Sequence, residues 1–385
     1  MNKVLLIAPF CADPRSIWFS PGRVRKLNQV MDILEGLGYC THILNTSPDP
    51  LKLDHTVVFN PFAGHRRLLP RLKALLQLVF SYLLSLKEIQ SYRLVWVYNS
   101  RLFEALPALV LSLGFAQRHL VVQLEDLPGS RAQNSGTLTF ALERLLLWLL
   151  QRRSALLTCV SPVVEKSIQR DGLQRFYPPP VVLFPPLLDS ALVAGSALRA
   201  EPFTGPLITV VYAGGADPEK GLVDLLTVFS KLPDHYQLQL YGPCSPEQIG
   251  VSPDRKNVCW YGYVPMASLF NALLSADVVV NPHRPIRQQQ GIFPFKTAEL
   301  LGSGALALSR RTPGLEWFEF PEACIYDRPE QLQRLLLEAP SIYKANRDSL
   351  AQAHANCMRI CSAEAVQQQL ATVLNIQHFP NSSVY

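Results

Sequence analysis

The sequence predicts an α/β protein made of two doubly wound, Rossmann-like parallel-sheet domains that face a central cleft. Three observations predict this fold class. Short apolar runs of strand length alternate with longer helical stretches from the first residues onward. The apolar runs are continuous, as expected for strands covered on both faces. The chain has 385 residues and is 48% hydrophobic, which favours two domains over one.

The first series of elements fills the amino-terminal half of the chain. We expect strands at residues 3–9, 40–44, 56–59, 94–98, 119–124 and 156–160, and helices at 23–37, 68–89, 102–113 and 138–152. Right-handed crossovers bring the carboxyl ends of such strands to one edge of the sheet, where ligands bind.

A proline-rich stretch at residues 177–186, followed by a small and polar segment at 191–206, interrupts the series and predicts a hinge. The series restarts with strands expected at 207–212, 237–241, 258–261, 278–281 and 305–309, and helices at 221–231, 266–275, 296–302 and 329–337. The expected domains are therefore 1–190 on the amino-terminal side and 191–360 on the carboxyl side. A helix and tail at 361–385 can pack back on the first domain.

The composition indicates which kinds of ligand the protein can bind and in which cellular compartment we expect it. The net charge of +6 suits phosphorylated ligands and anionic headgroups, and the absence of a dense Lys/Arg stripe argues against nucleic acid. Eight scattered cysteines indicate free thiols in a reducing compartment, and Cys357 and Cys361 beside His354 supply too few ligands for zinc. The first apolar run is too short for a signal sequence, and no run of about eighteen apolar residues occurs. We expect a cytoplasmic protein without a metal.

The most informative segment, residues 276–308, predicts a strand, a loop, a helix and a second strand. Pro294 suits the first turn of the helix, whose backbone N–H groups are available to an anion such as a diphosphate. One turn further along, the Glu299 carboxylate can accept hydrogen bonds from ribose hydroxyls, unless it only stabilises the helix dipole. The candidate ligands of the diphosphate at this helix are Phe295, Lys296 and Thr297.

A second segment, residues 210–226, predicts a strand, a glycine turn and a helix. Gly214 and Gly215 let the backbone approach a ligand, and the Lys220 ammonium can neutralise a diphosphate leaving group. The alternative for Lys220 is a solvated turn residue.

These segments resemble the retaining glycosyltransferases of family four, the glycosyl transferases group 1, over about residues 207–316. Of the two family glutamates separated by seven residues, the second matches Glu299 and the first falls on Gly291. Gly215 stands where the family usually has an arginine. The resemblance implies the GT-B fold, a nucleotide diphosphate sugar donor, retention at the anomeric carbon and no required metal or cofactor. It also places Glu299 on the ribose and Lys220 on the diphosphate.

Further candidates follow from the resemblance and from polar residues at strand ends. Arg284 and Arg287 can replace the missing arginine, although loop cations are commonly only solvated. Gly22 is a candidate because its segment, Ser-Pro-Gly-Arg, resembles the loop that approaches the donor phosphates in the family. Glu125 and Asp126 follow a strand and are candidates for orienting an acceptor hydroxyl, unless they only end that strand.

Two helical stretches combine basic and large apolar residues. Residues 66–87 begin with arginines and continue with leucines, and residues 145–153 repeat the combination. This pattern is typical of a helix in a membrane interface, and equally of a helix packed in the core. Attachment would suit a lipid-linked acceptor at the inner face of the cell membrane.

The sequence thus predicts a glycosyltransferase that moves a sugar to a glycan or lipid-linked acceptor in cell-surface polysaccharide or glycolipid synthesis. Gly291 and Gly215 leave a second hypothesis open, a binding or scaffold subunit of GT-B shape that has lost transfer. An epimerase or phosphorylase on the same scaffold is a third, since a fold alone does not define a function.

Overall fold

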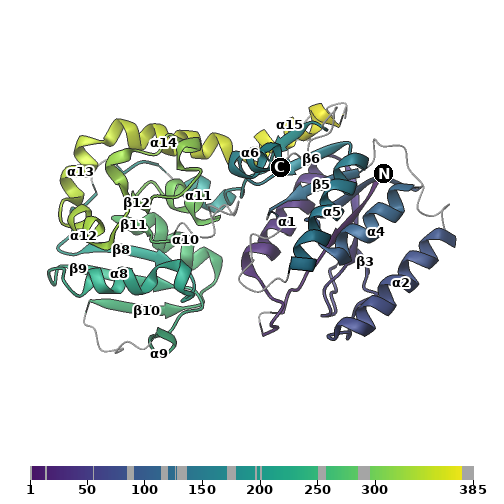
Figure 1. Ribbon diagram of the computed structural model, residues 1–385. Coiled ribbons are helices and arrows are strands. Elements are labelled where there is room, and N and C mark those ends of the chain that lie inside the picture. The colour runs from purple at the N-terminus through teal and green to yellow at the C-terminus, as the bar shows by residue number, and fades with distance from the viewer. Residues whose placement is uncertain are drawn as a thin grey trace. The chain divides into compact units, whose positions relative to one another are not determined.

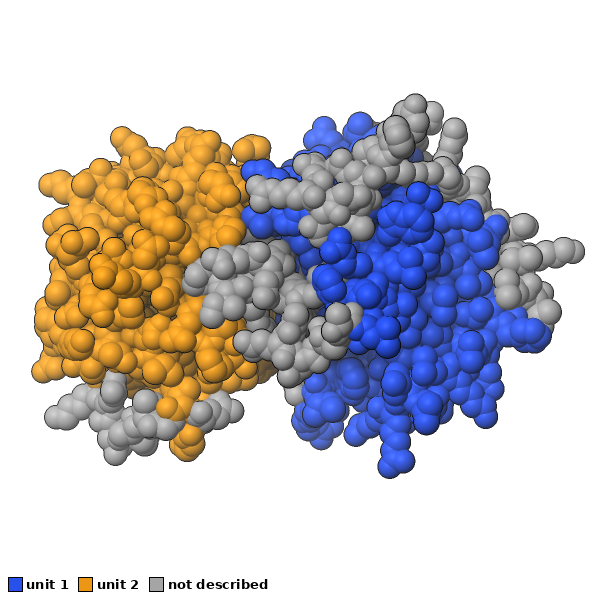
Figure 2. Space-filling model, in the orientation of Figure 1, with its two compact units in different colours: residues 1–187, 363–385 blue, residues 188–362 orange. Residues whose placement is uncertain are grey.

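The structure is a computed structural model, and it describes residues 2–13, 15–54, 56–84, 91–113, 120–125, 127, 137–170, 179–195, 197–199, 202–249, 257–284 and 295–374. The chain divides into two compact units (Figure 2). The first unit comprises residues 1–187 and 363–385, and the second comprises residues 188–362.

The first unit contains a seven-stranded sheet in the order β3-β2-β1-β4-β5-β6-β7 (Figure 1). Its paired strands all run parallel. The strands are β1 (Asn2–Ala8), β2 (Tyr39–Asn45), β3 (Val57–Phe59), β4 (Tyr92–Tyr98), β5 (Leu120–Leu124), β6 (Leu156–Cys159) and β7 (Val181–Leu183). The strand order reverses between β1 and β4, which is where ligands bind in folds of this kind.

Helices accompany this sheet along the chain: α1 (Pro21–Gly36), α2 (Leu68–Leu84), α4 (Leu102–Leu113), α5 (Thr137–Arg153), α6 (Pro162–Arg170) and α15 (Ala363–Val373). Neighbouring residues of β1, such as Leu5 and Leu6, are both buried although they point to opposite faces. The sheet is therefore covered on both sides, as the continuous apolar runs indicate.

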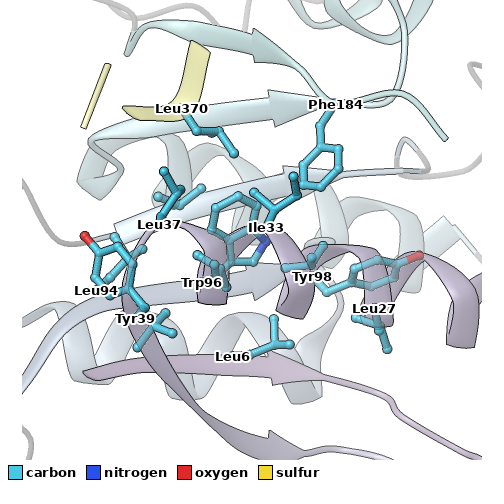
Figure 3. Close-up of a cluster of buried hydrophobic side chains, with 14 of the residues drawn as sticks. Leu6, Leu27, Ile33, Leu37, Tyr39, Leu94, Trp96, Tyr98, Phe184 and Leu370 are labelled. Carbon is cyan, nitrogen blue, oxygen red and sulfur yellow. The ribbon is translucent and has the colours of Figure 1, made fainter. Parts of the chain in front are cut away.

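The main core of the first unit lies between the sheet, α1 and α15 (Figure 3). Leu6 of β1 and Trp96 of β4 meet Ile33 of α1 and Leu37, the residue after this helix, and Leu370 of α15 joins the same cluster. The indole N–H of Trp96 donates a 2.7 Å hydrogen bond to Gln123 Oε1, so even the most polar group of this core is satisfied.

The second unit contains a six-stranded parallel sheet in the order β10-β9-β8-β11-β12-β13. The strands are β8 (Ile208–Ala213), β9 (Tyr236–Tyr241), β10 (Val258–Gly262), β11 (Val278–Asn281), β12 (Leu306–Arg310) and β13 (Ile325–Tyr326). The order reverses between β8 and β11, so the loops after these two strands flank the expected ligand position.

The helical elements of this unit are α7 (Ser190–Gly195), η2 (Pro218–Lys220), α8 (Leu222–Phe229), α9 (Pro246–Ile249), α10 (Met266–Ser275), α11 (Phe295–Gly302), η4 (Leu315–Phe318), η5 (Glu322–Cys324), α12 (Pro329–Leu337), α13 (Ala339–Ala345) and α14 (Arg347–Ile360). Helix α8 contacts α12, whereas α11 contacts α14 and α7. The predicted fold of two doubly wound parallel sheets is confirmed.

Two strands, β7 and β13, were not expected from the sequence. Residues 177–186 read as a proline-rich break, yet β7 lies within this stretch and pairs with β6. Three consecutive residues with high strand propensity, Val181, Val182 and Leu183, form it between flanking prolines.

Two further properties concern the described residues only. Among them, no helix combines the length and apolar character needed to cross a membrane. All eight cysteines are free thiols, and Cys357 and Cys361 are fully buried.

Candidate functional site

The glycine turn after β8 is closely packed against the turn after β9. A Cβ atom at Gly214 would lie 2.1 Å from the Tyr212 hydroxyl oxygen, and one at Gly242 would lie 2.3 Å from the Gly214 carbonyl oxygen. Both positions therefore accept only glycine. At Gly215 the nearest atom would be Asp217 Oδ2, at an ordinary 3.4 Å. Gly215 is thus less confined than Gly214.

The Lys220 turn lies against the loop after β11. Gly221 has a φ of +70°, and a Cβ there would lie 2.0 Å from the Pro282 carbonyl oxygen. The Arg284 backbone N–H donates a 2.8 Å hydrogen bond to the Glu219 carbonyl oxygen. These two contacts fix Lys220 beside the switch point of the sheet.

Arg284, a predicted phosphate ligand, contacts a carboxylate in the structure. Its Nη2 lies 2.9 Å from Asp224 Oδ1, and Arg310 Nη1 lies 2.9 Å from Asp224 Oδ2. Burial alone would raise the pKa of Asp224, but the hydrogen bonds and charges of the two arginines outweigh it and lower this pKa. The hydrogen bond to Asp224 also raises the pKa of Arg284.

Lys296 lies where several ionisable groups meet. Its Nζ is 5.7 Å from the centre of the Tyr212 ring. Burial lowers the pKa of Lys296 to about 8; the attraction of Glu299 opposes this shift and the nearby Lys220 cation adds to it. The structure therefore brings together three predicted residues, Lys220, Lys296 and Glu299, and Glu299 is only 8% exposed.

The first turn of α11 contains a polar group without a partner. The Thr297 side chain is 3% exposed, and its hydroxyl oxygen has no hydrogen-bond partner within the described structure. Phe295 is the first residue of α11. Backbone N–H groups at the start of a helix attract anions, and a bound oxyanion would also satisfy this hydroxyl.

His283 belongs to a chain of buried polar side chains. Its Nδ1 lies 2.6 Å from Asn281 Oδ1, and Asn281 Nδ2 donates a 3.1 Å hydrogen bond to Ser309 Oγ. All three side chains are buried. This chain of contacts joins the ends of β11 and β12.

In the first unit, Glu125 belongs to a buried network. Its Oε1 lies 3.5 Å from Lys26 Nζ and accepts a 2.6 Å hydrogen bond from Gln123 Nε2. The Lys26 ammonium also donates to the carbonyl oxygens of Phe184 and Pro185, each at 2.6 Å. Glu125 was predicted to orient an acceptor hydroxyl, whereas in the structure its Oε1 contacts Lys26 and Gln123.

The remaining candidates divide into two groups. Gly22 is the second residue of α1, and a Cβ there would meet no atom within 4 Å. Three positions of the predicted site lie outside the described residues: Asp126, Arg287 and Gly291. Within the described part of the chain, no group of three or more His, Cys, Asp or Glu side chains is placed to hold a metal ion.

Two site residues were missed by sequence reasoning. Asp224 stands in the first turn of a helix, where an acidic residue is ordinary, and only the structure shows that it joins Arg284 to Arg310. Lys26 lies in α1 and is fully buried. A lysine in an amphipathic helix normally indicates the solvent face, so its spacing carried no signal.

Comparisons with known proteins fit this geometry. Residues 223–375 match a family described as glycosyl transferase-like. No curated protein matches the chain by sequence. Among solved structures, sucrose-phosphate synthase from Thermosynechococcus elongatus is similar with a TM-score of 0.70 and 15% identity, covering 97% of this chain and 98% of that one.

Two further structures share the fold. Anabaena HepE in complex with UDP-glucose has a TM-score of 0.64 and 13% identity, covering 97% of this chain and all, 100%, of that one. WaaG, a glycosyltransferase involved in lipopolysaccharide biosynthesis, has a TM-score of 0.59 and 13% identity, with 97% and 99% covered. The protein therefore has the GT-B fold, and residues 223–375, which begin in the second unit and end in the first, are similar to the glycosyl transferase-like family.

Proposed function

We propose that the protein is a glycosyltransferase whose second unit binds a nucleotide diphosphate sugar. The observation that carries this proposal is the meeting of Lys220, Lys296 and Glu299 at the amino-terminal end of α11, next to the unpartnered hydroxyl of Thr297. Burial and the nearby Lys220 both disfavour the charged form of Lys296, and a bound diphosphate would favour it.

In the proposed arrangement, Glu299 accepts hydrogen bonds from the ribose hydroxyls, while Lys220 and Lys296 bind the diphosphate with the N–H groups of the first turn of α11. The same cations stabilise the negative charge that develops on the diphosphate as the bond between the donor sugar and the diphosphate breaks. The departing phosphate oxygen accepts the proton of the acceptor hydroxyl, and the sugar is transferred with retention. This chemistry uses no metal.

The similar structures bear on the donor and the acceptor. HepE is solved with UDP and with UDP-glucose, which supports a uridine nucleotide as the first donor to test. WaaG is involved in lipopolysaccharide biosynthesis, which supports a lipid-linked or glycan acceptor. The rival hypothesis of a scaffold subunit differs in one observable respect, because it predicts nucleotide binding without transfer.

A thermal-shift screen with UDP, GDP, ADP and their sugar conjugates tests the donor site, because a ligand that binds only the folded state raises the Tm. We expect one nucleotide to raise the Tm and Glu299→Ala to abolish that shift. Glu322→Ala is the matched control, since the Glu322 side chain is 73% exposed and pairs with Arg311 on the surface. A shift that survives in the Glu299→Ala variant would contradict the placement of the ribose.

The proposal includes peripheral attachment of the first unit to the cytoplasmic face of a membrane through α2. Leu68, Leu69, Leu76 and Phe80 on this helix are 62–78% exposed. The opposite side of α2 packs through Ala74 and Leu75 against Phe62. Exposed Arg66, Arg67 and Lys73 accompany the apolar side chains, and this combination fits anionic headgroups.

Sedimentation with vesicles tests this attachment. We expect binding to vesicles that contain phosphatidylglycerol, weaker binding to phosphatidylcholine alone, and release by salt. The double variant Leu76→Gln/Phe80→Gln should lose binding, whereas Val223→Gln, which changes an exposed apolar residue of α8 in the second unit, should keep it. Equal binding by both variants would argue against α2 as the contact.

A further inference from the structure

The first unit contains a second cluster of polar groups at the carboxyl edge of its sheet, away from Glu125. It consists of Trp18 from the loop after β1, Thr46 after β2, Arg71 of α2, and Glu104 in the first turn of α4. The loops after β1 and β4 flank the position where the strand order reverses. This is the ligand-binding edge of a doubly wound sheet.

Arg71 is the centre of the cluster. Its guanidinium carbon lies 4.0 Å from the centre of the Phe103 ring and 5.4 Å from that of Trp18. Arg71 Nη2 donates a 2.9 Å hydrogen bond to the Thr46 carbonyl oxygen, and the Thr46 hydroxyl donates to Glu104 Oε1. The charges of Arg71 and Glu104 are close enough to influence each other. The four side chains therefore form one connected group.

Three polar atoms of this group make no hydrogen bond within the described structure. Trp18 Nε1, Arg71 Nε and Glu104 Oε2 are buried and have no hydrogen-bond partner within the described structure. Glu104 is only 3% exposed. Buried polar atoms without partners are rare in folded proteins, because each costs free energy, and a cluster of them calls for a function.

We propose that these atoms bind the hydroxyl groups of a sugar, as a carbohydrate subsite of the first unit. A sugar hydroxyl can donate to the Glu104 carboxylate and accept from the Trp18 and Arg71 N–H groups, so neighbouring hydroxyls satisfy both kinds of atom at once. A phosphate group would satisfy only the two donors and would be repelled by the carboxylate. The inference deepens the proposed function, because it places the acceptor sugar.

Saturation-transfer NMR with the methyl glycosides of glucose, galactose and N-acetylglucosamine tests the subsite on the full chain. We expect at least one glycoside to bind, and Trp18→Phe and Glu104→Gln each to weaken its binding about tenfold, the usual effect of losing one such hydrogen bond. The control is Thr41→Val, which removes another unpartnered buried hydroxyl in β2, outside the cluster. It should bind the glycoside normally.

Stability separates binding from a structural role. Glu104→Gln keeps the shape of the side chain and the oxygen that accepts from Thr46, and it removes a buried charge, so the Tm of the unliganded protein should not fall. A lower Tm with unchanged glycoside binding would overturn the inference, and so would the absence of glycoside binding or equal binding by both variants, the result expected if these atoms only bind water.

The nucleotide screen keeps the two proposals distinguishable. A protein that responds to UDP but whose glycoside binding ignores Trp18 and Glu104 refutes the subsite alone. A protein that binds glycosides through Trp18 and Glu104 but no nucleotide refutes the donor site and keeps the subsite.

Discussion

Two lysines, one near the carboxyl edge of each sheet, differ in the groups that surround their ammonium ions. At the end of β5, the Lys26 ammonium lies 3.5 Å from the Glu125 carboxylate and donates to two main-chain carbonyl oxygens. In the second unit, Lys296 is close to a second cation, Lys220, and the neighbouring Thr297 hydroxyl has no partner in the described structure. The first lysine contacts groups of the protein itself, whereas the charge of the second is favoured by Glu299 and disfavoured by burial and by Lys220.

This difference shows how a binding site can be recognised in a protein that has two units of the same fold. A buried charge with a complete set of partners stabilises one structure and has little left to offer a ligand. Like charges and unpartnered polar atoms lower the stability of the unliganded protein, and a ligand of the right chemistry recovers that stability. The contrast therefore predicts opposite responses when each group is removed.

The largest effect is expected at Lys26. Lys26→Met should lower the free energy of unfolding by about 3–5 kcal/mol, because it leaves the buried Glu125 carboxylate without its cation. Urea denaturation measures this loss, and Lys73→Met, at an exposed position of α2, is the control. The remaining folded protein should bind nucleotide normally. A loss below about 1 kcal/mol, as for a surface pair, would remove the distinction between the two lysines.

Lys296→Ala should act in the opposite way. We expect nucleotide affinity to fall about 100-fold, because a partly buried cation that pairs with the diphosphate is lost. The stability of the unliganded protein should not fall, since the substitution removes a charge that burial disfavours, as the lowered pKa of Lys296 indicates. Calorimetric titration of the variant and of Lys231→Ala, an exposed lysine of the same unit, checks this. A Lys296→Ala variant that is unstable but binds nucleotide would reverse the assignment.

Protonation of Lys296 sharpens the comparison further. With its pKa at about 8, Lys296 loses its charge between pH 7.5 and 9, so nucleotide affinity should fall about eightfold over this range. The unfolded chain has the higher lysine pKa and binds more protons between about pH 8 and 10.4, so the contribution of this group to the stability of the unliganded protein rises with pH in that window.

Lys296→Arg separates this effect from other titrations, because a guanidinium stays charged throughout the range. The variant should show an affinity that no longer depends on pH between 7.5 and 9. An unchanged pH profile in Lys296→Arg would assign the dependence to another group.

The smallest effect is expected at Thr297. Thr297→Val removes the unpartnered hydroxyl while keeping the shape of the side chain, so the Tm of the unliganded protein should stay the same or rise slightly. Nucleotide affinity should fall about threefold, the lower range for one neutral hydrogen bond. Thr297→Ser, which keeps the hydroxyl, should bind like the native protein. A lower Tm in Thr297→Val would place the hydroxyl among the structural groups.

The sequence predicted the fold well because the fold depends on patterns within short segments. Continuous apolar runs marked β1, β8 and β11 and implied covered sheets, as the structure shows. The short strand β7 escaped because flanking prolines outweighed three residues of strand propensity. The strand β13 and the 14-residue helix α14 were also not predicted.

The candidate site was less predictable because it depends on contacts between distant segments. Glu299, Lys296 and Lys220 were found through the helix start and the glycine turn. The pairing of Glu125 with Lys26 spans 99 positions, and no local pattern reveals it. The same holds for Arg71 and Glu104, which α2 and α4 bring to one place. Residue type and spacing therefore predicted the candidate residues of the nucleotide sugar site. The tertiary structure was needed to show which charged side chains already pair within the protein.

The packing of α15 in the first unit affects the order in which the two units can complete their folding during translation. Val366, Leu370 and Ala371 belong to the same core as Leu34 of α1 and Leu37, which follows this helix. They are translated after all of residues 188–362, which cluster into a compact unit of their own. Domains usually complete their folding in the order of synthesis. In this chain the core of the first unit lacks the α15 side chains until the second unit has been synthesised, so the second unit can fold first.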